Sequence, residues 1–244
     1  ACFECGPEIG WIESGCADVL SPEGISWAKN VEESDEIFRR AAKIIAEGGI
    51  VAVKGLGGYH LVCDAANEAA LATLRQRKHR PGKAFAVMVA SAEEARTLCE
   101  VNDAEARQLT SPARPIVLLR KRPDATFAKG LADNLPELGV MLPTTPVQHL
   151  LLHECGGMLV MTSGNIHDEP IVIDEETAFS QLAGVADAFL VNNREIVGRY
   201  DDSVIRILNG GAAGDIVQFI RRARGYAPLP ISAPCPEGTS EELL

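Results

Sequence analysis

The sequence contains no apolar run long enough to cross a membrane. Its longest apolar stretches, such as residues 50–53 and 158–161, fall far below the roughly 20 residues that a membrane helix needs. The N-terminus lacks the basic and then apolar pattern of a secretion signal. Cysteines are also few, seven and therefore odd in number, and thinly spread. We expect a cytoplasmic protein, without disulfides and without a membrane partner.

Basic residues are in short supply as well. The chain has 23 Lys and Arg against 34 Asp and Glu, a net charge of −11. Because binding along a phosphate backbone depends on clustered Lys and Arg, this balance argues against a nucleic-acid partner. The 244 residues, 46% of them hydrophobic, suffice for one large α/β domain or two small ones.

Strands and helices are predicted to alternate after the first thirty residues, which show no clean period. Helices are expected from Ser34, its cap, to the Gly48-Gly49 stop, and over 67–76, 91–100, 146–153 capped by Thr145, and 175–182 capped by Asp174. Strands are expected over 50–53, 84–90, 116–119, 139–142, 159–162, 188–191, 203–208 and 215–220. The pattern predicts an α/β fold, a mixed sheet of about seven strands packed by helices. The Pro-rich and acidic segment 231–244 is expected to be a disordered tail or linker.

Five of the 23 basic residues lie within nine positions, 75–83. Arg75 and Arg77 either complement the C-terminal end of a helix or belong to an anion site. Lys78, Arg80 and Lys83 lie beyond the expected helix end, around a Pro-Gly turn beside a strand. They are the stronger candidates for an anion site.

Two polar segments also follow predicted strands. The run 54–60, KGLGGYH, is either a backbone approach to a ligand or a plain tight turn, and it lacks the GK[ST] of a Walker loop. Ser163 and Asn165, after the strand at 159–161, either orient a small polar ligand or cap a turn.

A last group of candidates lies near the C-terminal strands. Arg199 precedes Asp201-Asp202, and Arg221 ends the following strand. The arginines are candidates to clamp phosphates and Asp201 to contact Mg²⁺, although paired Asp before a strand is also typical of a turn.

Metal ligands are otherwise sparse in the sequence. Cys2 and Cys5 form one CxxC, half of a tetrahedral zinc site, and no second CxxC follows, so we expect no zinc to be held by this segment alone. The five histidines are dispersed and predicted to be ordinary core or surface residues.

Five motifs in order resemble the YrdC-like domain of the HypF carbamoyltransferases of [NiFe]-hydrogenase maturation. They are KGLGGYHLVCDA (54–65), RKHRPGKAFAVM (77–88), LGVMLPTTPVQHLLL (138–152), MTSGNIHDEPI (161–171) and RYDDSVIR (199–206). The resemblance covers roughly residues 20–230, so the domain is placed at 21–230, and residues 1–20 are similar to the end of the zinc-finger region that precedes it in that family. Zinc is therefore expected only with the remainder of such a region.

The resemblance implies a twisted mixed sheet around a basic concave cleft that binds ATP with Mg²⁺. In that family, carbamoyl phosphate is hydrolysed elsewhere to carbamate. This domain joins carbamate to ATP, which gives carbamoyl-adenylate and pyrophosphate. Other HypF domains then pass the carbamoyl group to a cysteine of HypE as a precursor of cyanide.

The resemblance also implies roles for single residues. Ser163 and Ser203 would face carbamate, and with Lys54 and Arg80 they would carry the reaction. The nucleotide contacts implied are Lys78, Arg80, Lys83, Asn165, Arg199 and Arg221. Two positions depart from the related patterns: Met141 stands where threonylcarbamoyl-adenylate synthases have Arg, and Asn192 where a His is expected in HypF.

Three alternatives remain open from the sequence. The first is a YrdC-like RNA-binding module, which the net charge disfavours, and the second is a threonylcarbamoyl-adenylate synthase, which Met141 disfavours. The third is a docking platform for neighbouring HypF domains that carries no chemistry by itself.

Overall fold

The computed structural model describes residues 6–15, 20–166, 169–211 and 214–230. Cys2, Cys5 and the predicted tail 231–244 lie outside the described residues. The helices are α1 (Val31–Ala46), α2 (Glu68–Arg77), α3 (Ala92–Leu98), α4 (Asp103–Thr110), α5 (Pro146–Cys155) and α6 (Glu175–Leu182), with a short 3-10 turn at Pro22–Gly24. The strands are β1 (Ile9–Glu13), β2 (Ser26–Trp27), β3 (Val51–Lys54), β4 (Tyr59–Asp64), β5 (Ala86–Met88), β6 (Cys99–Glu100), β7 (Ile116–Lys121), β8 (Glu137–Met141), β9 (Leu159–Ser163), β10 (Ala188–Asn192), β11 (Val204–Asn209) and β12 (Asp215–Arg221).

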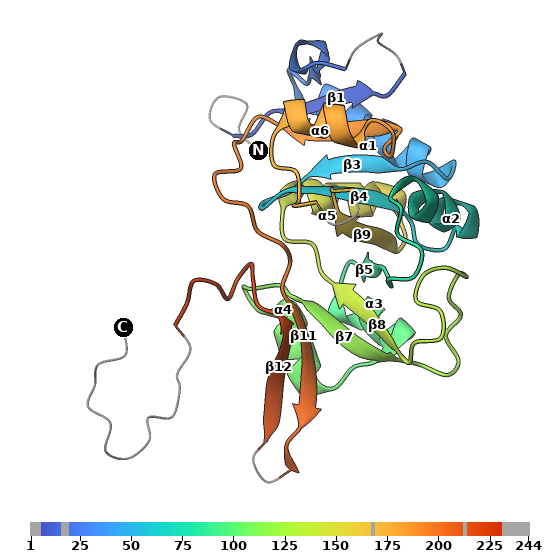
Figure 1. The fold of residues 1–244 in the computed structure, drawn as a ribbon, viewed down its shortest axis with the longest axis vertical. Helices are drawn as coiled ribbons and strands as arrows, with labels where there is room; N and C mark the ends of the chain where they lie inside the picture. Colours follow the sequence, from blue (N-terminus) through green and yellow to red (C-terminus); the bar gives the residue numbers. More distant parts are fainter. Residues whose placement is uncertain (1–5, 16–19, 167–168, 212–213, 231–244) are drawn as a thin grey trace.

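The strands form one mixed sheet, in the order β12-β11-β7-β8-β5-β9-β4-β3-β10-β1-β2, with β6 paired to β7. The pairs β10–β3, β5–β8 and β11–β7 are parallel, and the other pairs are antiparallel. Figure 1 shows the sheet running from β1 at one end of the molecule to the β11–β12 hairpin at the other. The mixed α/β fold is as predicted.

The strand number is not as predicted, since the described part of the chain has twelve strands where about seven were expected. Three of the missed strands are short or lie in the N-terminal segment: β1, β2 and β6. The fourth, β4, is buried at five of its six positions, so it shows no alternation of polar and apolar residues. Helix α4 was missed too, and β1 corrects the expectation of no regular structure before residue 30, because it pairs with β10 along five residues.

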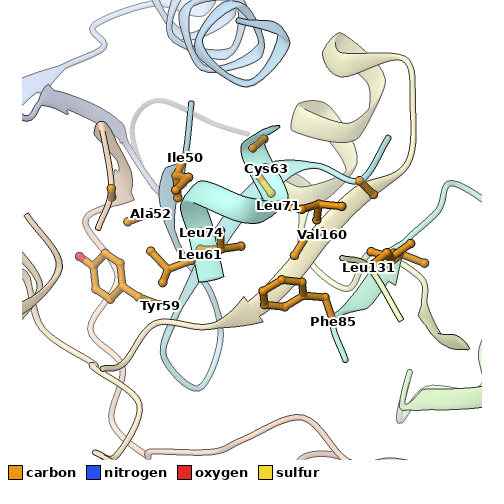
Figure 2. Packing of buried hydrophobic residues seen from close by; sticks show 14 of the residues in the cluster. Ile50, Ala52, Tyr59, Leu61, Cys63, Leu71, Leu74, Phe85, Leu131 and Val160 are labelled. Carbon is orange, nitrogen blue, oxygen red and sulfur yellow. The ribbon is translucent and has the colours of Figure 1, made fainter. Parts of the chain in front are cut away.

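Two hydrophobic cores fill the two faces of the sheet. On β3, Val51 and Val53 pack into the core under α1 and α5, while Ala52 belongs to the core on the side of α2 and α6. This alternation follows from the two-residue period of a strand. Figure 2 shows the core on the side of α2 and α6, in which Leu61 of β4 and Leu74 of α2 pack.

Local capping explains most of the helix ends. Thr145 and Asp174 cap α5 and α6 as predicted. Helix α1 instead begins earlier than predicted, because Asn30 accepts the Glu33 backbone N–H and Ser34 lies inside the helix. Among the described residues, no helix is both long and apolar enough to cross a membrane.

Candidate functional site

A cavity of about 180 Å³ opens where β4, β5 and β9 approach the chain before β11. Ligand pockets usually measure roughly 300–1,000 Å³. This cavity is smaller, so it suits the reacting end of a ligand whose other atoms lie outside the cavity. The polar and charged side chains that line it are His60, Arg80, Thr162, Ser163, Asp201, Asp202 and Arg221. Predicted candidates from three separate motifs thus meet at one place.

Arg80 is the most buried cation that lines the cavity. One of its terminal nitrogens donates to the Ala84 carbonyl at 3.0 Å, and its Nε is buried without a hydrogen-bond partner in the described structure. Burial lowers the pKa of Arg80, and the positive charges of Arg75 and Arg221 lower it further. Three cations held close together and one unused buried donor favour an anionic ligand.

Arg75 holds the loop that carries Arg80. It donates to the carbonyls of Gly130, Arg80 and Lys83 at 2.5–3.0 Å, and its guanidinium lies 4.4 Å from the centroid of the Phe85 ring. Lys83 itself is exposed. The sequence offered two interpretations of Arg75, a charge at a helix end or a ligand contact. The structure favours neither, because the Arg75 donors bind carbonyl oxygens of the neighbouring loops.

Lys78 is the C-cap residue of α2 and is only 3% exposed. Its Nζ donates to the Ser163 carbonyl at 2.5 Å, to the Asn165 carbonyl at 2.6 Å and to Asn165 Oδ1 at 2.7 Å. Burial lowers the pKa of Lys78 to about 7, Arg80 and Lys83 contribute in the same direction, and Asp201 opposes them. Lys78 thus joins the two predicted ligand segments, but through its own hydrogen bonds to the protein.

The aspartates at 201 and 202 have different environments. Asp201 lines the cavity half-exposed and lies 3.9 Å from Arg221. Asp202 is held by His60 Nε2 at 3.0 Å and by Arg224 Nε at 2.9 Å. Burial raises the pKa of Asp202, but the hydrogen bond and charge of His60, with Arg224, outweigh burial and keep it well below its usual range. Only Asp201 of this pair remains available to a ligand or metal ion.

His60 is a site residue that the sequence analysis missed. It was predicted to be an ordinary core or surface residue, yet its side chain lines the cavity and is only 9% exposed. It lies directly opposite Ser163 in the β4–β9 ladder, so the two side chains share one face of the sheet. The signal was hidden because β4 itself was not recognised as a strand.

Lys54, a predicted reaction residue, does not reach the cavity. In the β3–β4 ladder it pairs with Tyr59, whereas the cavity residue His60 pairs with Val53, so Lys54 lies on the opposite face. Its side chain is 4% exposed, forms an ion pair with Glu175 and donates to the Asn192 carbonyl at 3.1 Å. The prediction that Lys54 lies near the other cations is therefore corrected, because Lys54 pairs with Glu175 at the N-terminal end of α6.

Two further candidates lie outside the cavity lining. Ser203 is fully buried, and its hydroxyl donates to the Arg224 carbonyl at 2.9 Å and accepts the Ala223 N–H at 2.8 Å. Arg199 is exposed on the chain that leads to β11. The structure thus brings Arg80, Ser163, Asp201 and Arg221 together, with Lys78 and Asn165 directly behind them.

The glycine-rich turn after β3 packs against protein. A Cβ at Gly57 would lie 2.4 Å from the Tyr200 carbonyl oxygen, and one at Gly58 would lie 2.5 Å from Ile171. The glycines therefore permit a close approach of other chain segments, which favours the tight-turn alternative for residues 54–60.

The fold and site together define an α/β protein with a twisted mixed sheet and an arginine-lined cavity. The chain belongs to the Sua5/YciO/YrdC family, described as "Telomere recombination", whose model matches residues 43–223. This agrees with the resemblance noted in the sequence motifs.

The relatives make the relationship more specific. Carbamoyltransferase HypF2 of Cupriavidus necator is 49% identical over 217 residues, which cover 82% of this chain and 26% of that protein. A crystal structure of full-length HypF in the phosphate- and nucleotide-bound form is 47% identical with a TM-score of 0.81, covering 95% of this chain and 28% of that one. Sua5 of P. abyssi in complex with L-threonine shares the fold, at 21% identity, a TM-score of 0.66, and coverage of 78% and 54%. The chain thus spans about a quarter of the HypF proteins that it matches.

Proposed function

We propose that this chain binds ATP at the Arg80–Arg221 cavity and joins carbamate to it, as the nucleotide-activating part of a HypF-type carbamoyltransferase. A carbamate oxygen attacks the α-phosphorus, the bond from that phosphorus to the bridging oxygen of the β-phosphate breaks, and pyrophosphate leaves. The products are carbamoyl-adenylate and pyrophosphate. Further HypF domains would form carbamate from carbamoyl phosphate and transfer the carbamoyl group to HypE.

The observation that carries this proposal is the convergence of Arg80, Arg221 and Ser163 on one small cavity. Phosphoryl and nucleotidyl transfer depend mainly on positioning and on cations that stabilise charge on the phosphate oxygens. Arg80 lines the cavity and keeps its Nε without a hydrogen-bond partner among the described residues, so the protein does not use all of its donors. Catalysis of this kind needs no cysteine or histidine nucleophile.

Magnesium fits this site as a companion of ATP. Within the described residues, no group of three or more His, Cys, Asp or Glu is placed to hold a metal. Asp201 supplies one carboxylate at the cavity, and Mg²⁺ is commonly held by one or two carboxylates together with substrate phosphates. When bound with ATP, the ion would neutralise charge on the leaving pyrophosphate.

The residue at position 141 disfavours threonine as the substrate. Met141, in place of the arginine of the threonylcarbamoyl-adenylate synthases, is 1% exposed and packs into the core beneath α5. An apolar thioether that is buried in the core and does not line the cavity offers no partner for the carboxylate of threonine. Carbamate has only the carboxylate that reacts, so it needs no additional cation at this position.

Calorimetric titration with ATP and Mg²⁺, combined with a pyrophosphate assay, tests the proposal. Bicarbonate and ammonia serve as the source of carbamate, with threonine added in a parallel series. We expect ATP binding and carbamate-dependent pyrophosphate release. Release that requires threonine would identify the synthase instead. Binding without release would leave a nucleotide site that depends on other domains, and no binding would favour a docking platform. Tight RNA binding that falls steeply between about 50 and 200 mM salt would favour the RNA-binding module.

A further inference from the structure

The Ser163 hydroxyl has a fixed hydrogen-bond direction, because Lys78 orients the group to which it donates. The chain of contacts runs from Lys78 to Asn165 and from Asn165 to Ser163, which lines the cavity.

In its charged form Lys78 has three protons on Nζ, and all three are used. Each is donated to an oxygen within 2.7 Å: the Ser163 carbonyl, the Asn165 carbonyl and Asn165 Oδ1. A lysine ammonium has three donors and no acceptor, so none is left for a phosphate. Lys78 is therefore placed to organise the turn at 163–165 and not to bind the nucleotide directly.

These contacts fix the orientation of the Asn165 amide. An ammonium beside the amide requires that its oxygen, and not its NH₂ group, faces Lys78. The opposite side of the amide agrees with this, because Asn165 Nδ2 donates to the Glu169 carbonyl at 2.5 Å. Two independent partners thus select the same orientation.

The orientation of Asn165 in turn determines where the Ser163 proton points. Ser163 Oγ lies 2.8 Å from Asn165 Oδ1, an atom that can only accept, so the hydroxyl must donate to it. What Ser163 then presents to the cavity is the lone pairs of its oxygen. A hydrogen-bond acceptor repels a carboxylate and binds an N–H group.

We propose that Ser163 accepts a hydrogen bond from the amino group of carbamate, and that Lys78, acting through Asn165, is the positioning residue that enforces this. The inference rests on the proposed function and adds an orientation to it: NH₂ toward Ser163, and carboxylate toward Arg80, Arg221 and the α-phosphorus. A carboxylate with a methyl group in place of NH₂ would leave the Ser163 lone pairs unpaired, so the site selects for an N–H donor.

A matched pair of stable adenylate analogues tests this orientation without turnover. Both have the phosphate-linked acyl group replaced by an unreactive isostere. One ends in –CONH₂ and the other in –COCH₃. We expect calorimetry on the wild-type chain to show roughly tenfold tighter binding of the amide, the scale of one hydrogen bond. In Ser163→Ala and in Lys78→Met the two affinities should become nearly equal.

The variants separate a positioning role from a loss of structure. Ser180→Ala removes a matched hydroxyl on α6 and should keep the tenfold preference. Within the described part of the chain, that hydroxyl bonds only the Thr177 carbonyl, at 3.1 Å. Lys78→Met should equalise the two affinities mainly by weakening the amide, whereas general unfolding would abolish binding of both. Hydrogen exchange of the amides at 163–165 should be faster in Lys78→Met, and unchanged exchange there would refute the bracing role.

Each result for the wild-type chain has a distinct meaning. Equal binding of the two analogues, or preference for the ketone, would overturn the Ser163 orientation and leave the nucleotide function standing. Failure of both to bind would overturn the proposed function, and the orientation with it. An amide preference that survives Lys78→Met would assign the selectivity to Ser163 without Lys78.

Discussion

Replacing Lys54 by methionine tests whether this residue stabilises the fold, as its place in the structure indicates, or takes part in the reaction, as the motif resemblance implies. Lys54 lies on the face away from the cavity and pairs with Glu175. Removing one partner of a buried ion pair costs about 3–5 kcal/mol. Since the Glu175 side chain is 23% exposed, water can solvate part of the charge left behind. We therefore expect a loss of about 2–3 kcal/mol in the free energy of unfolding and almost no change in ATP affinity.

Urea unfolding and calorimetric titration with ATP measure the two effects separately. A loss of that size corresponds to a fall of about 4–12 °C in Tm for a chain of this length. The double variant Lys54→Met/Glu175→Gln should recover much of the stability, because it leaves no unpaired charge. Lys43→Met is a matched control at an exposed pair and should change stability little. If Lys54→Met lost ATP binding at unchanged stability, Lys54 would contact the nucleotide and our face assignment would be wrong.

Three further predictions follow from single contacts. Arg80→Ala should weaken ATP binding by about 1.5–3 kcal/mol in calorimetry, since it removes charge-assisted hydrogen bonds, and unchanged affinity would contradict its place in the site. Gly57→Ala should lower the free energy of unfolding in urea by about 1–3 kcal/mol, because its Cβ would lie 2.4 Å from the Tyr200 carbonyl oxygen; Gly184→Ala, with open space around it, should not. The lowered pKa of Asp202 stabilises the fold above about pH 4, and that stability is lost as the pH falls further. Asp202→Asn should therefore flatten the dependence of unfolding free energy on acid pH, and a slope equal to that of the wild type would refute this.

Much of the fold was predictable because its signals are local. Helices α5 and α6 were placed within two residues of their observed ends, since Thr145 and Asp174 cap them through their own side chains. Strand β9 was found as an apolar run. Strand β4 was not, because burial on both faces removed its alternation and three glycines just before it suggested a loop.

Part of the site was predictable for a different reason. Arg80, Lys83, Ser163 and Asn165 belong to motifs whose order resembles a known family, and the same resemblance implies Arg221 as a nucleotide contact. Three of these residues, Arg80, Ser163 and Arg221, line the cavity. His60 could not be found in this way, since its importance depends on its place opposite Ser163 across two strands.

The sequence by itself determined the alternation of helices and strands, the capped helix ends, and which segments carry cations and hydroxyls. These properties depend on contacts within a few residues. Only the tertiary structure decided which of those side chains meet. The two-residue period of the strands sends Lys54 away from the cavity and brings His60 and Ser163 to the same face. Likewise, the approach of α2 to the end of β9 directs the charge of Lys78 toward Asn165. A side chain's partners are thus set by register and packing between distant segments, which no local pattern encodes.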